Sequence, residues 1–187
     1  MQLYLLLQLF LIVILALNLN LEVGDFLKQN QLKKIQNNSM SEIRLGILGG
    51  GQLGSMLSVA AKKLNIKTLI YSDDQDAPAQ NFCDEFMFGD YKDKNKINDF
   101  VKKVNIVTYE FENIPYETLN EINKFKTVNP KPSINRLIQH RLAEKDFVNK
   151  LNIRTTRYVS IEKKSDLETL GDFLPGILKT TTMGLSL

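Results

Sequence analysis

The chain has 187 residues, 43% hydrophobic and 24% charged, which suits one globular domain and part of a second. Its net charge of +3, without any run of Lys and Arg, gives no indication of a nucleic-acid surface. A single cysteine, Cys83, excludes an intrachain disulfide, and a single histidine, His140, excludes a metal site or catalytic triad built on several histidines.

Residues 1–39 differ in character from the rest of the chain. Residues 3–17 are almost wholly apolar, but a spanning helix needs about 20 such residues, and no basic residue precedes the run. Residues 28–39 are polar and low in complexity, as in a linker. Three interpretations stay open: an upstream extension with Met40 as the natural start, a membrane anchor, and an amphipathic or packed helix. We favour the first, which implies no membrane partner.

A strand, a glycine-rich turn and a helix are predicted next. The apolar run at 43–48 indicates a buried parallel strand, and the sequence GGGQLG at 49–54 contains the pattern G-x-G-x-x-G. Apolar residues then recur at helical spacing over 55–66. Glycines let the backbone approach an anion closely, and a helix start offers free N–H groups. The segment therefore predicts a phosphate-binding loop, although tight structural turns share this pattern.

Two acidic residues follow the next predicted strand, at 67–71. Asp73 and Asp74 stand about 20 residues past the glycine turn, where dinucleotide-binding enzymes place an acidic residue for the ribose hydroxyls. The sequence DDQDAP at 73–78 is also rich in turn-forming residues. Both interpretations stay open, and we favour the turn.

The alternation of strands and helices continues to about residue 128. Strands are predicted at 85–88, 105–109 and 127–128, and helices within 97–104 and at 115–124. This order predicts a doubly wound, Rossmann-like α/β fold with a parallel sheet and helices on both faces. Ligands of such sheets bind beyond the carboxyl ends of the strands, where Glu110 and the glycine turn both fall. Glu110 is therefore a candidate for binding ribose hydroxyls or an amine, although for an isolated Glu we favour a solvated charge at a strand end.

Several motifs together resemble those of 5-(carboxyamino)imidazole ribonucleotide synthase, a family of ATP-grasp enzymes of purine biosynthesis. They are GILGGGQLG at 46–54, DAPA at 76–79, DEFMFGDY at 84–91, VTYEFENIP at 107–115, PKPSINRLIQHRLAEKDFVNKLNI at 130–153 and LPGILKTTTMG at 174–184. The resemblance implies a pre-ATP-grasp substrate domain with a linker helix at 40–150 and the beginning of an ATP-grasp domain at 151–187. It also implies the ATP-dependent carboxylation of 5-aminoimidazole ribonucleotide with bicarbonate.

The resemblance implies roles for particular residues. Positions that face the ribonucleotide in this family or its formyltransferase relative are matched by Gly51, Gln52, Leu53 and Glu110. Arg141 matches an arginine that contacts ATP, and Lys179 matches a lysine on the ATP phosphates. Fixed cations of this kind stabilise charge on a transferring phosphoryl group. Without the resemblance, both would be interpreted as surface or strand-end cations.

The chain departs from the family at three places. His140 stands where the family has Asp, and we interpret it as a partly exposed helical residue rather than a catalytic one. Ser55 stands where the family often has Arg, which weakens a phosphate contact. After Gly184 the sequence ends with LSL, before the family's glycine-rich lid and the acidic residues that hold Mg²⁺. We therefore expect a truncated chain that is inactive alone, with catalytic residues and metal ligands beyond residue 187.

Two rival functions remain from the residues alone. A nicotinamide-dependent oxidoreductase would rest on the glycine pattern and Asp73, but no catalytic base with a partner is visible for it. A non-catalytic nucleotide-binding module is the other. The resemblance implies ATP and Mg²⁺ as cofactors, 5-aminoimidazole ribonucleotide, bicarbonate and ATP as small-molecule partners, and a homodimer for the full-length protein. A cytoplasmic location agrees with the lone thiol.

Overall fold

The structure is a computed structural model that describes residues 43–182. The interpretations of residues 1–39 and of the last three residues lie outside this range. The strands are β1 (Arg44–Leu48), β2 (Lys67–Ser72), β3 (Glu85–Phe88), β4 (Ile106–Tyr109) and β5 (Val128–Asn129). The helices are α2 (Gln52–Lys63), α3 (Lys94–Lys103), α4 (Tyr116–Ile122), α5 (Pro132–Ile138) and α6 (Arg141–Lys150). Short 3-10 helices are η1 (Pro78–Asn81), η2 (Lys164–Thr169) and η3 (Gly171–Phe173).

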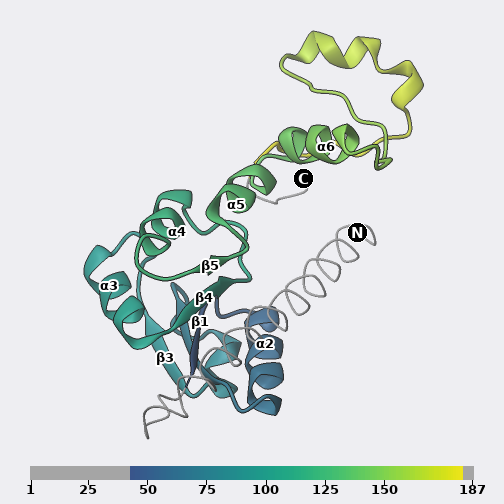
Figure 1. Ribbon diagram of the computed structural model, residues 1–187. Helices are drawn as coiled ribbons and strands as arrows, with labels where there is room; N and C mark the ends of the chain where they lie inside the picture. The colour runs from purple at the N-terminus through teal and green to yellow at the C-terminus, as the bar shows by residue number, and fades with distance from the viewer. Residues whose placement is uncertain (1–42, 183–187) are drawn as a thin grey trace, which may run out of the picture.

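The five strands form one parallel sheet in the order β3-β2-β1-β4-β5 (Figure 1). The predicted parallel α/β fold is therefore confirmed. From β1 the chain adds β2 and β3 on one side, and it then crosses to add β4 and β5 on the other. The order thus reverses between β1 and β4, and the loops that follow these two strands lie next to each other. Ligand sites of open parallel sheets form at such a reversal.

Helices cover both faces of the sheet, as the alternating pattern predicted (Figure 1). On one face, α3 and α4 pack on Leu48, Leu69 and Val107, all fully buried. On the other, α2 and η1 pack on Leu45 and Ile47. Neighbouring residues of β1 point to opposite faces, as the pleat of a strand requires. Each fully buried aliphatic side chain contributes about 1.5–3 kcal/mol, so both faces hold β1 in place.

Helix α2 begins three residues earlier than its apolar pattern predicted, because it starts inside the glycine turn. Gly51 is its N-cap, with φ −73° and ψ −165°. The helix also ends earlier than predicted, at Lys63. Asn65 has a φ of 57°, a left-handed conformation that Asn tolerates and that stops helices. The turn and the first helix are therefore one continuous unit.

Helices α5 and α6 lead the chain away from the sheet (Figure 1). Helix α6 contains no fully buried residue, and residues 151–182 are mostly exposed. The backbone N–H of Arg141 donates to the carbonyl oxygen of Thr181 at 2.8 Å, which brings the last described segment beside the start of α6. The domain boundary at residue 150 stays a prediction. None of the helices in residues 43–182 has the length and apolar character needed to cross a membrane.

Candidate functional site

The carboxylate of Glu110 lies against the glycine turn at the point where the strand order reverses. The backbone N–H of Glu110 donates to the carbonyl oxygen of Leu48 at 3.1 Å, which continues the pairing of β4 with β1. Its Oε1 accepts a hydrogen bond from the N–H of Gly51 at 2.9 Å. Two segments that are 59 residues apart in sequence therefore meet at one point.

The turn can hold this carboxylate only because two of its residues lack side chains. A Cβ on Gly49 would lie 2.7 Å from Glu110 Oε1, and a Cβ on Gly51 would lie 3.1 Å from the same atom. Gly49 also has a φ of +109°, which L side chains rarely adopt. Its N–H donates to the carbonyl oxygen of Tyr71 at 2.9 Å, so the turn is anchored to β2. The first and second glycines of the motif thus shape a seat for a carboxylate.

The opposite wall of the glycine turn comes from the DAPA motif at 76–79, to which the sequence assigned a turn but no part in the site. The backbone N–H of Ala79 donates to the carbonyl oxygen of Gly50 at 3.0 Å. A Cβ on Gly50 would lie 2.5 Å from Cβ of Ala77. Small residues here let two turns pack against each other. The small side chains of Ala77 and Ala79 are the one sequence feature that could have indicated this packing against the glycine turn.

Burial raises the pKa of Glu110 above its ordinary range, and the nearby charge of Glu112 raises it further. The N–H of Gly51 acts in the opposite direction, because it stabilises the ionised form. This N–H is one of those that the sequence assigned to a phosphate. The structure instead pairs it with a carboxylate, whose charge would repel a phosphate at that position. The site suits a ligand that donates hydrogen bonds, such as a hydroxyl or an amine.

The four residues predicted to face the ribonucleotide lie together at this site. Gly51, Gln52 and Leu53 are consecutive at the start of α2, and Glu110 reaches them from β4. Gln52 is exposed, and Leu53 is half-buried. Ser55, one turn further on, donates from Oγ to the carbonyl oxygen of Gly51 at 3.1 Å. The Ser55 side chain therefore stabilises the glycine turn through a hydrogen bond to its backbone.

The two aspartates after β2 form a turn. The backbone N–H of Asp74 donates to Oγ of Ser72 at 3.2 Å, and Oδ1 of Asp74 accepts from the N–H of Asp76 at 2.9 Å. Such side-chain bonds to the following backbone are typical of turns rich in Asp. Asp73 itself is exposed. The turn interpretation is supported, and these contacts give no independent support to the dinucleotide interpretation.

The two predicted ATP residues lie on neighbouring segments. Arg141 is the first residue of α6, and its bond to Thr181 places it near Lys179, which is exposed two residues earlier. Nε of Arg141 is buried and has no hydrogen-bond partner among residues 43–182. His140 is exposed and caps α6, since Nδ1 accepts from the N–H of Ala143 at 3.4 Å. It is thus a helix cap rather than a residue within the helix.

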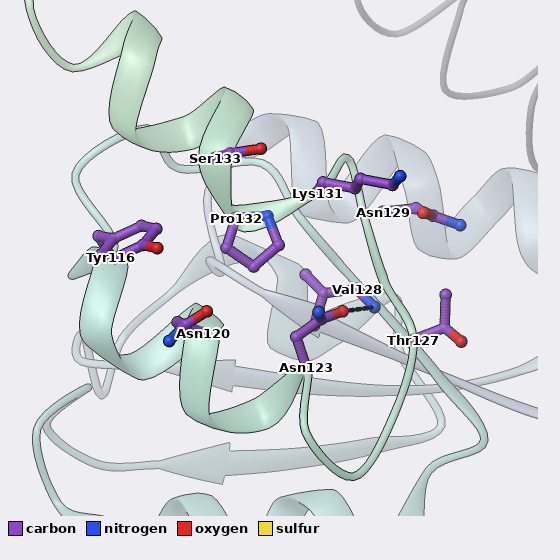
Figure 2. A pocket seen from close by; sticks show the side chains of 9 residues that line it. All are labelled: Tyr116, Asn120, Asn123, Thr127, Val128, Asn129, Lys131, Pro132 and Ser133. Carbon is purple, nitrogen blue, oxygen red and sulfur yellow. Dashed lines mark hydrogen bonds between the residues drawn. The ribbon is translucent and has the colours of Figure 1, made fainter.

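A separate cavity of about 290 Å³ lies between α4, β5 and α5 (Figure 2). Its lining shares no residue with the predicted site, and most of its side chains are exposed. One of them, Asn123, uses its Oδ1 to accept from the N–H of Val128 at 3.1 Å. We therefore place the candidate site at the glycine turn. Within residues 43–182 there is no group of three or more His, Cys, Asp or Glu side chains that could hold a metal ion.

The raised pKa of Glu110 predicts a specific dependence of stability on pH. The ordinary pKa of the carboxyl is 4.5, so its stabilising contribution is present below that value and is lost as pH rises through the raised pKa. Glu110→Gln keeps an oxygen for Gly51 but does not ionise. The free energy of unfolding of Glu110→Gln minus that of the wild type should therefore increase with pH above 4.5 and then level off.

Urea unfolding followed from about pH 4 to about pH 8 measures this difference. Other titrating groups are common to both proteins and cancel. Glu117→Gln, at an exposed position on the first turn of α4, is the control and should not reproduce this increase. A flat difference for Glu110→Gln would contradict the assignment of a buried carboxylate.

The chain is similar to known proteins in both sequence and fold. Residues 40–139 match the family described as the ribonucleotide synthetase preATP-grasp domain. The bifunctional purine synthesis protein purC/E of Dictyostelium discoideum is 38% identical over 142 residues, which are 75% of this chain and 14% of that protein. The N5-carboxyaminoimidazole ribonucleotide synthase of Staphylococcus epidermidis is 34% identical over 140 residues, 73% of this chain and 37% of that enzyme.

Solved structures of the same enzyme are also similar. The synthetase from Thermus thermophilus superposes with a TM-score of 0.66 at 32% identity, over 73% of this chain and 38% of that one. The Aspergillus clavatus synthase, solved with ADP and 5-aminoimidazole ribonucleotide, gives 0.60 at 28% identity, over 72% and 36%. The chain thus spans well under half the length of these synthases. It belongs to the ribonucleotide synthetase preATP-grasp family.

Proposed function

We propose that this chain supplies the ribonucleotide-binding part of an enzyme that carboxylates 5-aminoimidazole ribonucleotide with bicarbonate and ATP. In that reaction ATP phosphorylates bicarbonate, and the exocyclic amine of the ribonucleotide then takes the carboxyl group, releasing phosphate. The observation that carries the proposal is the carboxylate of Glu110 seated on the glycine turn at the reversal of strand order. The Aspergillus clavatus neighbour contains this ribonucleotide together with ADP, which supports the choice of ligand.

At the glycine turn, each proposed residue has a role that its position allows. Glu110 accepts hydrogen bonds from ribose hydroxyls or from the amine, since ionised carboxylates are acceptors only. The exposed amide of Gln52 both donates and accepts, and Leu53 offers an apolar contact. Gly51 fixes the carboxylate through its N–H. Held in this way, Glu110 orients the ribonucleotide without having to reorganise on binding.

On the ATP side, Arg141 and Lys179 are proposed to contact the nucleotide. The buried Nε of Arg141 lacks a protein acceptor among the described residues, as expected of a donor reserved for a ligand. Lys179 would place its ammonium on the phosphates, where a fixed cation stabilises the charge of phosphoryl transfer. The family resemblance implies Mg²⁺, but residues 43–182 contain no cluster of three or more His, Cys, Asp or Glu side chains that could bind it. We therefore assign no metal ligand to these residues.

The remaining partners follow from the same proposal. Bicarbonate is the carboxyl donor, and a homodimer is the assembly proposed for a full-length member of the family. We place the protein in the cytoplasm, where metabolites of this kind occur and where a lone thiol such as Cys83 stays reduced. Neither nucleic acid nor a membrane takes part.

Calorimetric titration of the chain with 5-aminoimidazole ribonucleotide tests the site directly. Glu110→Gln should weaken binding about 10- to 100-fold, because hydrogen bonds to a charged group contribute about 1.5–3 kcal/mol. Glu117→Gln is the matched control and should bind as the wild type does. Lys179→Ala should weaken the binding of ATP and leave that of the ribonucleotide unchanged.

Two results would contradict the proposal. One is equal affinity of Glu110→Gln and wild type for the ribonucleotide. The other is tighter binding of NADH than of the ribonucleotide by the wild type, which would favour the oxidoreductase interpretation. Carboxylation measured in a version of this chain extended to the length of its relatives, with and without Lys179→Ala, then tests the reaction itself.

A further inference from the structure

The loop that carries Glu110 is held at its far end by two side-chain amides of the α5 segment. Nε2 of Gln139 donates to the carbonyl oxygen of Glu112 at 2.7 Å and to that of Ile114 at 2.8 Å. Nδ2 of Asn135, a fully buried residue, donates to the carbonyl of Ile114 at 3.0 Å. Residues 110–114 are therefore fixed at one end by β4 and at the other by these amides.

Gln139 also stands at the junction of the two last helices. It is the C-cap of α5, and the next two residues are the N-cap of α6 and Arg141. A second observation places the loop close to α6. The pKa of Glu144 is raised, first by burial, and the charge of Glu112 adds to the rise while Arg141 and Lys145 oppose it. The loop after β4 thus lies within electrostatic reach of the first turn of α6.

We propose that Gln139 is a positioning residue that fixes the 110–114 loop and so keeps the carboxylate of Glu110 seated on the glycine turn. Gln139 bonds the loop two residues beyond Glu110, at the carbonyl of Glu112. Loss of both bonds loosens the middle of the loop, and Glu110 then leaves Gly51 more often and meets more water. Through the same bonds the loop is tied to the junction that carries Arg141. The effect on ligand binding rests on the proposed function, whereas the seating of Glu110 does not.

The test uses the whole chain and two glutamine variants. Gln139→Met keeps an unbranched side chain of similar length and removes both donors. Gln80→Met changes an exposed glutamine on η1 in the same way and is the control. Nuclear magnetic resonance measures the pKa of the Glu110 carboxyl and the hydrogen exchange of the Gly51 N–H. The exchange of Ile47, buried in β1, reports global unfolding in the same sample.

In Gln139→Met we expect Gly51 to exchange about tenfold faster relative to Ile47, since one hydrogen bond changes such an equilibrium by about that factor. The pKa of Glu110 should fall towards its ordinary value, because water reaches the carboxyl. Gln80→Met should change neither. Unchanged Gly51 exchange and Glu110 pKa in folded Gln139→Met would overturn the proposal.

Two further measurements separate the possible failures. Gln139→Lys keeps a hydrogen-bond donor on a side chain of similar reach, so this variant should fold and should protect the Gly51 N–H from exchange. Fast exchange of Gly51 in Gln139→Lys would overturn the proposal, even if Gln139→Met does not fold. Titration with 5-aminoimidazole ribonucleotide should show about tenfold weaker binding by Gln139→Met. If the wild type does not bind the ribonucleotide, the proposed function fails, and the exchange data still decide the role of Gln139.

Discussion

Gly49→Ala is expected to lower the free energy of unfolding by about 3 kcal/mol, from two separate causes. The φ of +109° at this position is unfavourable for any L side chain and costs about 1–3 kcal/mol. The new Cβ would also lie 2.7 Å from Oε1 of Glu110, and overpacking of this kind costs about 1–3 kcal/mol. Urea unfolding measures the total. The variant should also lose affinity for the ribonucleotide that we propose as the ligand, because the carboxylate is displaced.

Two controls separate these causes. Gly171→Ala adds a Cβ that meets nothing within 4 Å, and its effect should stay within about 0.5 kcal/mol. In a Glu110→Ala background the carboxylate is absent, so Gly49→Ala should cost only the backbone part. An equal cost of Gly49→Ala in both backgrounds would show that the carboxylate does not crowd the turn.

Phe100→Ala is expected to destabilise the protein by about 3–5 kcal/mol, the usual effect of removing a buried aromatic ring. Phe100 is 0% exposed, and its ring packs edge-on against Tyr71 with centroids 5.7 Å apart. The ring also fills the space above Gly46 of β1, where a Cβ would lie 2.6 Å from its Cζ. Phe125→Ala is the control, because that residue is 64% exposed and the loss of its ring should cost far less.

Gly46, which lies against the ring of Phe100, allows a second test of this packing. Gly46→Ala alone should destabilise the protein, because its methyl group collides with the ring. In the Phe100→Ala background the same methyl group enters the vacated space, so the double variant should be less destabilised than the sum of the single variants. Strict additivity in thermal or urea unfolding would contradict the packing described for β1 and α3.

Local sequence patterns predicted the elements well, because each pattern reports a local requirement. The apolar tetrapeptide EFMF became β3 with the predicted bounds, 85–88, and the turn formers after β2 became a turn. Helix α3 begins earlier than its apolar residues predict. Asp93 caps the helix by accepting from the N–H groups of Asn95 and Lys96, so it begins at Lys94, before the apolar residues that marked it.

The contacts that make the site were beyond the reach of local patterns. The glycine turn and Glu110 could each be identified as a ligand candidate, but their pairing depends on β4 lying beside β1. Strand order is decided by packing across the whole sheet, and the residue types at positions 51 and 110 do not indicate which strands are neighbours. No local pattern marks Gln139 either, since its partner Glu112 is 27 residues away and accepts through a backbone carbonyl that any residue could offer.

The contact between Glu110 and the glycine turn limits which substitutions the two segments can accept. Because the space beside Gly49 and Gly51 is filled by a side chain from position 110, the shape of the turn and the size of that side chain are set together. A combinatorial library that varies positions 49, 51 and 110 independently should return mostly unfolded members. Folded library members with a side chain at position 51 should carry a small residue at position 110. Substitutions at the two positions are therefore coupled, although the positions are 59 residues apart in sequence.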